Sequence, residues 1–467
     1  MEVDTPVPAA ATIPASLQSE IDAAVALAPP PPSDPTAAVD ALLALERTHR
    51  LAASAPETAA VCVALVKMLV GRGEWRRVMD AVVVVAKRRA QLKQVLVEVV
   101  REVMGVLGEV EDGLRMEMVQ TLIDVCAGKI YVELERARLT RTLAEAKEKA
   151  GDVAGAAEIM QDLQVETYGS MERREKFDFI LEQIRLCLDK KDYIRAGIVS
   201  KKISAKSLAM EELSDLRLRY YKLMIRIYAQ QKKYLEICRA YLARFETKSV
   251  QENDSPAEGG WPHELQLAIA FLLVSPREPT QADLLLRIAN DKKTLSLSPL
   301  SDFLKLFKTL ELIRWPVLAE LYLPALRTIL GSLATLPEIV DIQAAAAKSC
   351  PEGEDVWSLA LRERVAEHNL RVVSTYFTRI RLGRLAELLG MTEAEAEKKL
   401  TEEVSDSKAL WAKIDRPAGI VLFAKPLEPS QVLNEWTGSV GSLLDMVDKT
   451  CHLVNKEVMV HQAAKGQ

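Results

Sequence analysis

The segment from Lys129 to Ala150 is predicted to form a helix that is apolar on two opposite faces. At about 100° per residue, one stripe contains Ile130, Leu134, Ala137 and Ala144, and a nearly opposite stripe contains Val132, Leu139, Leu143, Ala146 and Ala150. A helix on the surface of a compact core needs only one apolar stripe. Two stripes therefore indicate neighbours on both sides, as in a stacked array of helices in which each layer buries the next.

A degenerate turn recurs along this part of the chain. It consists of a Gly, Lys or Gln, one or two polar residues, and a bulky residue that opens the second helix of a pair. Copies occur at Trp75, Val153, Tyr193 and Tyr234, spaced by 78, 40 and 41 residues. We expect two more degenerate copies of the turn near Ala37-Ala38 and Gly113-Leu114. A period near 40 residues built from helix pairs is typical of a tetratricopeptide-like (TPR-like) or HEAT-like solenoid.

Beyond residue 355 the pattern changes to that of a small α+β domain. The expected elements are a helix at Val356–Phe377, a strand at Thr378–Ile380, helices at Leu382–Leu389 and Thr392–Val404, and strands at Trp411–Ile414 and Gly419–Phe423. This is the order of elements in a winged helix. Its recognition helix would carry five glutamates against Lys398 and Lys399. Such a helix would meet DNA phosphates with net negative charge, so a protein-binding winged helix is the preferred interpretation.

A long helix is expected from about Ser430 to His461. Apolar residues recur along it every three or four positions, close to a heptad seam: Leu433, Trp436, Val440, Leu443, Val447, Cys451, Val454 and Val458. We call these eight residues the seam and take them as the candidate partner interface. Because no later segment is expected to cover the seam, the helix must either fold back on its own domain or bundle with other chains.

The overall composition is that of a helical globular protein with no bias toward nucleic acid or membranes. Charged residues make up 27%, hydrophobic residues 49%, and the net charge is −5. The longest uninterrupted apolar runs, Ala81–Ala86 and Leu267–Val274, fall far short of the roughly 20 residues that span a bilayer. The Pro/Ala-rich residues 1–35 are expected to be a flexible tail without a secretory signal, and the location is expected to be cytoplasm and nucleus.

Motifs for chemistry are missing from the sequence. The five histidines are widely separated, and there is no metal-binding HExxH, phosphate-cradling glycine loop or nucleophile elbow. The six cysteines are isolated and expected to be reduced. The basic run Lys87-Arg88-Arg89 is expected to complement the dipole at the end of a helix. We therefore predict no enzyme activity, no metal and no cofactor.

Four segments carry a resemblance to a known family: GKIYVELERARLTRTL (128–143), LQVETYGSMERREKFDFILEQIRLCL (163–188), DYIRAGIVSKKI (192–203) and AKIDRPAGIVLF (412–423). They closely resemble the PCI-domain non-ATPase subunits of the 26S proteasome regulatory-particle lid, in the family numbered five in yeast nomenclature. The resemblance covers about residues 36 to 461. The regions that differ from the family are the N-terminal start, the acidic loop near residue 253 and the Ala-rich segment 331–350.

The resemblance implies a non-catalytic scaffold in ubiquitin-dependent protein degradation. Its implied partners are other PCI-containing lid subunits, the lid deubiquitinase, the ATPase base and the core particle. A PCI subunit of the signalosome or of a translation initiation complex would share the fold, although it should lack the VETYGSM segment. A winged-helix nucleic-acid-binding adaptor is the alternative from a different class.

The expected architecture is an all-α solenoid of TPR-like helical hairpins, followed by a small α+β winged helix and a long C-terminal helix. The expected boundaries are 1–35 for the tail, 36–330 for the solenoid, 331–355 for a linker, 356–427 for the winged-helix part of the PCI domain, and 428–467 for the C-terminal helix. The whole PCI module is expected to span about 240–427.

Overall fold

The computed structural model describes residues 14–28, 35–204, 206–256, 259–331, 337, 339, 355–406, 410–424 and 428–465. The chain divides into two compact units. The N-terminal unit is Met1–Ser255 with Gly259–Trp261, and the C-terminal unit is Pro256–Glu258 with Pro262–Gln467. The expected linker at 331–355 lies almost entirely outside the described residues.

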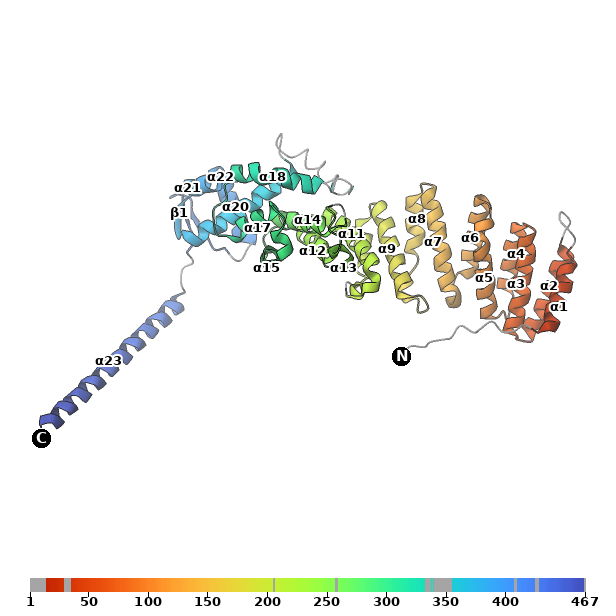
Figure 1. The fold of residues 1–467 in the computed structure, drawn as a ribbon, viewed down its shortest axis with the longest axis horizontal. Coiled ribbons are helices and arrows are strands. Elements are labelled where there is room, and N and C mark those ends of the chain that lie inside the picture. Colours follow the sequence, from red (N-terminus) through yellow and green to blue (C-terminus); the bar gives the residue numbers. More distant parts are fainter. Residues whose placement is uncertain are drawn as a thin grey trace. The chain divides into compact units, whose positions relative to one another are not determined.

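The N-terminal unit is an array of helices that stand side by side in chain order (Figure 1). Its α-helices are α1 Ala15–Ala26, α2 Thr36–Leu51, α3 Ala55–Gly71, α4 Trp75–Lys87, α5 Lys93–Val106, α6 Asp112–Cys126, α7 Glu133–Lys149, α8 Val153–Gln161, α9 Arg173–Asp189, α10 Tyr193–Ser200, α11 Ser214–Gln230, α12 Tyr234–Phe245 and α13 Lys248–Gln251. Short 3-10 turns are found at Leu107–Glu109, Ile130–Val132, Val165–Thr167, Ser207–Ala209 and Glu211–Leu213.

Helix α7 has neighbours on both faces, as the two stripes predict. Leu139 and Leu143 belong to a core cluster shared with α1–α6, whereas Ala137 and Ala144 belong to a second cluster shared with α8 and α9. The prediction is wrong for Ala150, which is exposed at the C-cap of α7, and for Ile130, which is 81% exposed. Ile130 lies in the 3-10 turn before α7, where the α-helical period does not apply.

The recurrent turn has a defined backbone conformation. The helices α4, α8, α10 and α12 begin at the four predicted bulky residues, and the residue two positions before each of them has a positive φ: Gly73 (73°), Gly151 (90°), Lys191 (63°) and Lys232 (55°). A left-handed residue reverses the chain after a helix. The same turn precedes α3 at Ala53, with φ 57°. The two more degenerate copies of the turn, near Ala37-Ala38 and Gly113-Leu114, coincide with the starts of α2 and α6. In the described chain, however, no residue with a positive φ is recorded directly before either helix.

Helix α1 corrects the expectation that residues 1–35 form a flexible tail. Its residues Leu17, Ile21 and Ala24 are buried in the core cluster of the N-terminal unit, and α1 packs against α2 and α3. These three residues recur at intervals of four and three, so they form one apolar stripe. The expectation of a tail rested on the Pro-rich composition around α1, which does not reveal so short an amphipathic segment. Residues 1–13 and 29–34 lie outside the described part.

A ladder of ion pairs links the successive helices α7, α9 and α11. Arg141 Nη1 donates to Asp178 (2.6 Å), which also accepts from Arg219 Nη1 (2.8 Å). Arg185 binds both carboxylate oxygens of Glu148 at 2.6 Å, as well as Glu182 (2.8 Å) and Asp189 (3.0 Å). Because each of these residues faces the neighbouring layer, the ladder helps to set the register between layers.

We expect Arg185→Ala to lower the free energy of unfolding by about 1 kcal/mol, since hydrogen bonds to the three carboxylates of Glu148, Glu182 and Asp189 are lost but Arg185 is partly exposed to solvent. The loss should shrink in high salt. Urea unfolding at low and high salt measures it. Arg239→Ala is the matched control, because the one carboxylate recorded for Arg239 among the described residues is Glu236 of its own helix, and Arg239 is more exposed. Equal losses for the two variants would contradict a role in linking layers.

The C-terminal unit contains helices followed by a small sheet. Its α-helices are α14 Trp261–Val274 (Trp261 itself is assigned to the N-terminal unit), α15 Pro279–Ala289, α16 Lys292–Leu295, α17 Leu300–Lys308, α18 Trp315–Gly331, α20 Val356–Tyr376, α21 Leu382–Leu389, α22 Glu393–Asp406 and α23 Pro429–Lys465, and its strands are β1 Arg379–Arg381, β2 Lys413–Asp415 and β3 Ile420–Leu422. None of the described helices is both long enough and apolar enough to cross a membrane.

The winged helix has the predicted order of elements, with boundaries shifted by one or two residues. The sheet has the order β1-β3-β2 with antiparallel pairing, and Val421 of β3 lies opposite both Ile380 and Ile414. The sheet packs on α20, α21 and α22 through a core that includes Leu385 and Leu400. Gly390 ends α21 with a positive φ of 66°, as the joint between the two short helices requires.

Candidate interaction surfaces

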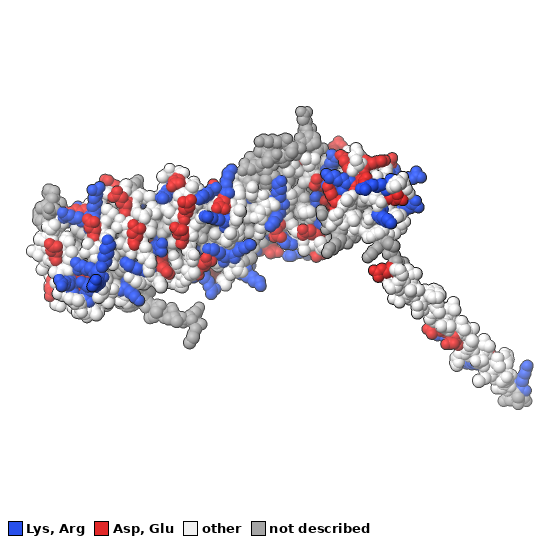
Figure 2. All heavy atoms as spheres, turned by 180° about the vertical axis from the view of Figure 1, so that it is seen from behind, with Lys and Arg blue, Asp and Glu red and all other residues white. Residues whose placement is uncertain are grey.

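Helix α23 carries the candidate interface, and none of its residues is buried. The seven larger apolar residues of the seam are between 40% (Val440) and 66% (Trp436) exposed, and Cys451 is also exposed. The structure therefore places all eight seam residues on one helix, where consecutive members lie one turn apart. Figure 2 shows the rod formed by α23 as mostly uncharged surface on the face in view.

The apolar surface of α23 extends beyond the predicted seam. Six further apolar residues are exposed on this helix: Val432, Leu444, Met446, Leu453, Met459 and Val460. At about 100° per residue, Met446, Leu453 and Val460 lie on one flank of the seam, whereas Leu444 and Met459 lie on the other. These six residues are not part of the predicted seam, because a heptad pattern follows a single stripe of the helix. A helix that is apolar on more than one side can contact more than one neighbouring helix.

The winged helix presents an acidic rather than a basic recognition helix. Five glutamates lie on α22, and Lys399 of this helix forms an ion pair with Glu402 (3.0 Å). The wing residue Arg416 donates to Glu397 (2.7 Å). The N-terminus of α22 is closed by a capping box, in which Thr392 N–H donates to Glu395 (3.1 Å) and Glu395 N–H donates to the Thr392 hydroxyl (3.4 Å).

We expect the full-length chain to bind double-stranded DNA only at the non-specific level, with a Kd of roughly 10⁻⁴ M or weaker near physiological salt. The reason is that α22 carries five glutamates, and that Lys399 and Arg416 already have carboxylate partners. Fluorescence anisotropy with random and selected duplexes measures this affinity. Sequence-specific binding tighter than about 10⁻⁷ M would reverse the interpretation.

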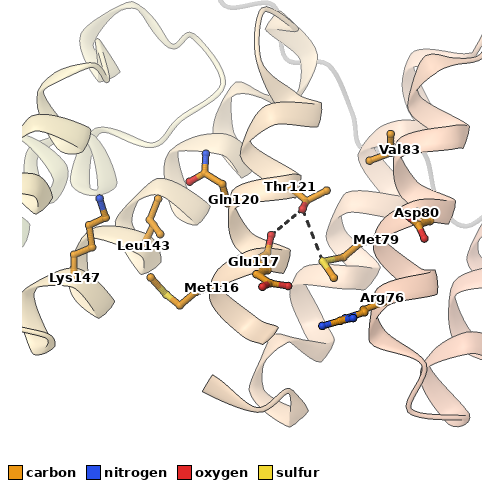
Figure 3. Close-up of a pocket in the computed structure, with 10 residues that line it drawn as sticks. All are labelled: Arg76, Met79, Asp80, Val83, Met116, Glu117, Gln120, Thr121, Leu143 and Lys147. Carbon is orange, nitrogen blue, oxygen red and sulfur yellow. Dashed lines mark hydrogen bonds between the residues drawn. The ribbon is translucent and has the colours of Figure 1, made fainter. Parts of the chain in front are cut away.

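An open groove of about 710 Å³ lies between α4, α6 and α7 of the N-terminal unit. Its walls include the apolar side chains of Met79, Val83, Met116 and Leu143, and charged side chains lie around them (Figure 3). The Thr121 hydroxyl contacts the Met79 sulfur at 3.8 Å. The charged lining residues have both signs, with Arg76 and Lys147 beside Asp80 and Glu117.

The buried cysteine thiols have low reactivity. Burial raises the pKa of Cys62 to about 12, that of Cys126 to about 11 and that of Cys238 to about 12. The thiolate, which is the reactive form, is therefore scarce at neutral pH. Within the described residues, no group of three or more His, Cys, Asp or Glu side chains is arranged to hold a metal ion.

Three family models match this chain. The model for the N-terminal region of PSMD12/CSN4 matches residues 37–253, the PCI domain model matches 357–425, and the model for the C-terminal domain of the 26S proteasome regulatory subunit RPN5 matches 430–462. The 26S proteasome non-ATPase regulatory subunit 12 of Dictyostelium discoideum is 40% identical, over 91% of this chain and 90% of that protein. The chain belongs to the RPN5 family of 26S proteasome regulatory subunits.

Other members of the RPN5 family match over nearly the same span. Subunit 12 homolog A of Arabidopsis thaliana is 39% identical over 92% of this chain and 98% of that protein, and RPN5 of Saccharomyces cerevisiae is 35% identical over 92% of both. The COP9 signalosome complex subunit 4 of Caenorhabditis elegans is only 22% identical, over 67% of this chain and 69% of that protein. The resemblance deduced from the four sequence segments is thus confirmed at the level of the RPN5 family.

Proposed function

We propose that this chain is a non-catalytic scaffold subunit of the 26S proteasome regulatory-particle lid, where it supports lid assembly and ubiquitin-dependent protein degradation. The observation that carries the proposal is α23. It is a 37-residue helix on which no residue is buried, and an RPN5 C-terminal model matches most of its length. Its many exposed apolar side chains need partners outside the described chain.

The energetics favour a helical bundle as the environment of α23. Burying one large aliphatic or aromatic side chain contributes about 1.5–3 kcal/mol. The seam and its flanks together expose more than ten such side chains, so association can offset the entropy lost when chains assemble. Because the exposed apolar residues occupy more than one stripe, we propose that α23 packs among several helices contributed by other PCI-containing lid subunits.

The proposal of a lid scaffold also covers further partners and the lack of catalytic activity. The lid deubiquitinase, the ATPase base and the core particle are the further partners that membership of the lid would entail, in cytoplasm and nucleus. We keep the other domain boundaries stated from the sequence as proposals, whereas α1 (Ala15–Ala26) belongs to the helical array and not to a tail. No observation favours the signalosome, initiation-complex or nucleic-acid alternatives.

The test is reconstitution with the other lid subunits of a related organism. The full-length chain, co-expressed in place of the relative's own subunit 12, should enter the complex stoichiometrically, as judged by native mass spectrometry. The purified chain alone should not cleave ubiquitin chains, with or without added zinc. The relative's own subunit 12 is the positive control for assembly. A chain that stays outside the complex while that control enters would refute the proposal, and metal-dependent cleavage by the chain alone would refute its non-catalytic part.

A further inference from the structure

The segment between α17 and α18 is held in place by two adjacent residues of α20. The buried side-chain amide of Asn369 makes both main-chain bonds to Ile313: Ile313 N–H donates to Asn369 Oδ1 (2.8 Å), and Asn369 Nδ2 donates to the Ile313 carbonyl (2.8 Å). A side-chain amide bound in this way imitates a neighbouring strand. The segment begins at Thr309, whose backbone is already extended (φ −77°, ψ 146°).

His368 makes a further bond to the same side of the segment. Arg371, which can only donate, lies 3.1 Å from His368 Nδ1, so Nδ1 must accept. The proton is therefore on Nε2, which donates to the Glu311 carbonyl at 3.1 Å. Burial lowers the pKa of His368, which keeps the ring neutral at neutral pH so that Nδ1 can accept from Arg371.

These bonds leave the other edge of the segment open. In an extended chain the N–H and C=O groups of successive residues point alternately to opposite sides. The Glu311 carbonyl and both main-chain groups of Ile313 point toward α20. In an extended chain the main-chain groups of Leu310 and Leu312 then point away from it. No hydrogen bond is recorded for the main-chain groups of Leu310 and Leu312 in the described part of the chain, and the two residues are 45% and 41% exposed.

We propose that this edge accepts an extended segment of a partner protein as an added β-strand. Strand addition uses main-chain hydrogen bonds for affinity and alternate side chains for specificity. The N–H and C=O groups of Leu310 and Leu312 supply the bonds, and Asn369 with His368 holds the edge in the extended form before the partner arrives. A preformed edge lowers the ordering cost of binding.

The side chains along the segment predict which sequence the partner strand should have. Leu310, Leu312 and Arg314 share one face of the extended segment, and Arg314 is exposed with no ion pair recorded for it among the described residues. An antiparallel partner strand would meet Arg314 first, then Leu312 and then Leu310. The matching pattern is an acidic residue, any residue, an apolar residue, any residue and a second apolar residue.

The test is selection of random dodecapeptides displayed on phage against the full-length chain, with counter-selection against its Leu312→Pro variant. Proline keeps an extended backbone but removes the N–H of residue 312 and blocks the edge. Counter-selection removes peptides that bind elsewhere, including those that bind α23. We expect enriched peptides with the acidic-x-apolar-x-apolar pattern, and affinity for Leu312→Pro should be at least about tenfold lower than for the unaltered chain.

Leu312→Ala is the matched control, because it removes the side chain and keeps the N–H. Strand addition predicts a much smaller loss for alanine than for proline, whereas side-chain docking alone predicts equal losses. In hydrogen exchange, the bound peptide should protect the amides of Leu310 and Leu312, while the Ile313 amide is protected already in the free chain. Unchanged thermal unfolding of both variants excludes misfolding. Failure to enrich any peptide, equal losses, or Leu310 and Leu312 amides already protected in the free chain would each overturn the proposal.

Discussion

The double substitution Leu443→Asp and Val447→Asp is expected to abolish incorporation of this chain into the lid. Both side chains are exposed in the structure and lie at the centre of the seam. Two carboxylates placed in a packed seam would cost several kcal/mol of assembly free energy, since a buried unpaired charge is strongly unfavourable. This corresponds to a loss of affinity of at least about a hundredfold. Native mass spectrometry of the reconstituted complex measures it.

The matched control is Asn434→Asp with His452→Asp. At about 100° per residue, both positions lie on the face of α23 opposite Leu443, so two acidic side chains are added without entering the seam. We expect this control to assemble much better than the seam variant. The thermal unfolding of the isolated seam variant should match that of the unaltered chain, because no residue of α23 is buried. A destabilised isolated chain would show that α23 packs on its own domain. Normal assembly with a charged seam would exclude the bundle.

Replacing Glu46 by alanine should lower the free energy of unfolding by about 3–5 kcal/mol. The Glu46 side chain is 1% exposed on α2, and it accepts hydrogen bonds from Arg50 (3.1 Å) and from Arg88, which follows α4. The substitution leaves two largely buried guanidinium groups without their carboxylate. Urea unfolding monitored by circular dichroism measures the change.

Glu145→Ala is the control for Glu46, because Glu145 is 48% exposed and its one ion pair in the described part of the chain is with Arg141 of its own helix. Its loss should be below about 0.5 kcal/mol. A triple variant that replaces Glu46, Arg50 and Arg88 by Leu, Met and Met should recover much of the stability, since no buried charge is then left unpaired. A loss at Glu46 no larger than that at Glu145 would mean that this buried cluster does not hold α2 to the end of α4.

Periodicity and turn chemistry were sufficient for much of the fold. Apart from their ends at Ile130 and Ala150, the two opposite stripes of α7 were correct, as were the starts of α4, α8, α10 and α12, because a helix period and a left-handed turn are local properties. The order of the winged-helix elements was equally readable from the sequence. The eight seam residues could be named because they repeat on a single helix, and the structure shows them exposed on α23. Their role as a partner interface stays a prediction.

Tertiary structure decided what depends on contacts between distant residues. Arg88 was interpreted as part of a basic helix end, yet it binds Glu46, which is 42 residues away. The burial of α1 depends on α2 and α3, so a Pro-rich composition could not reveal it. Asn369 and His368 look like ordinary polar residues of a helix, and only the fold brings them to Ile313 and Glu311, more than 50 residues earlier. Local patterns determine which face of an element is apolar, but long-range packing determines which polar group meets which partner.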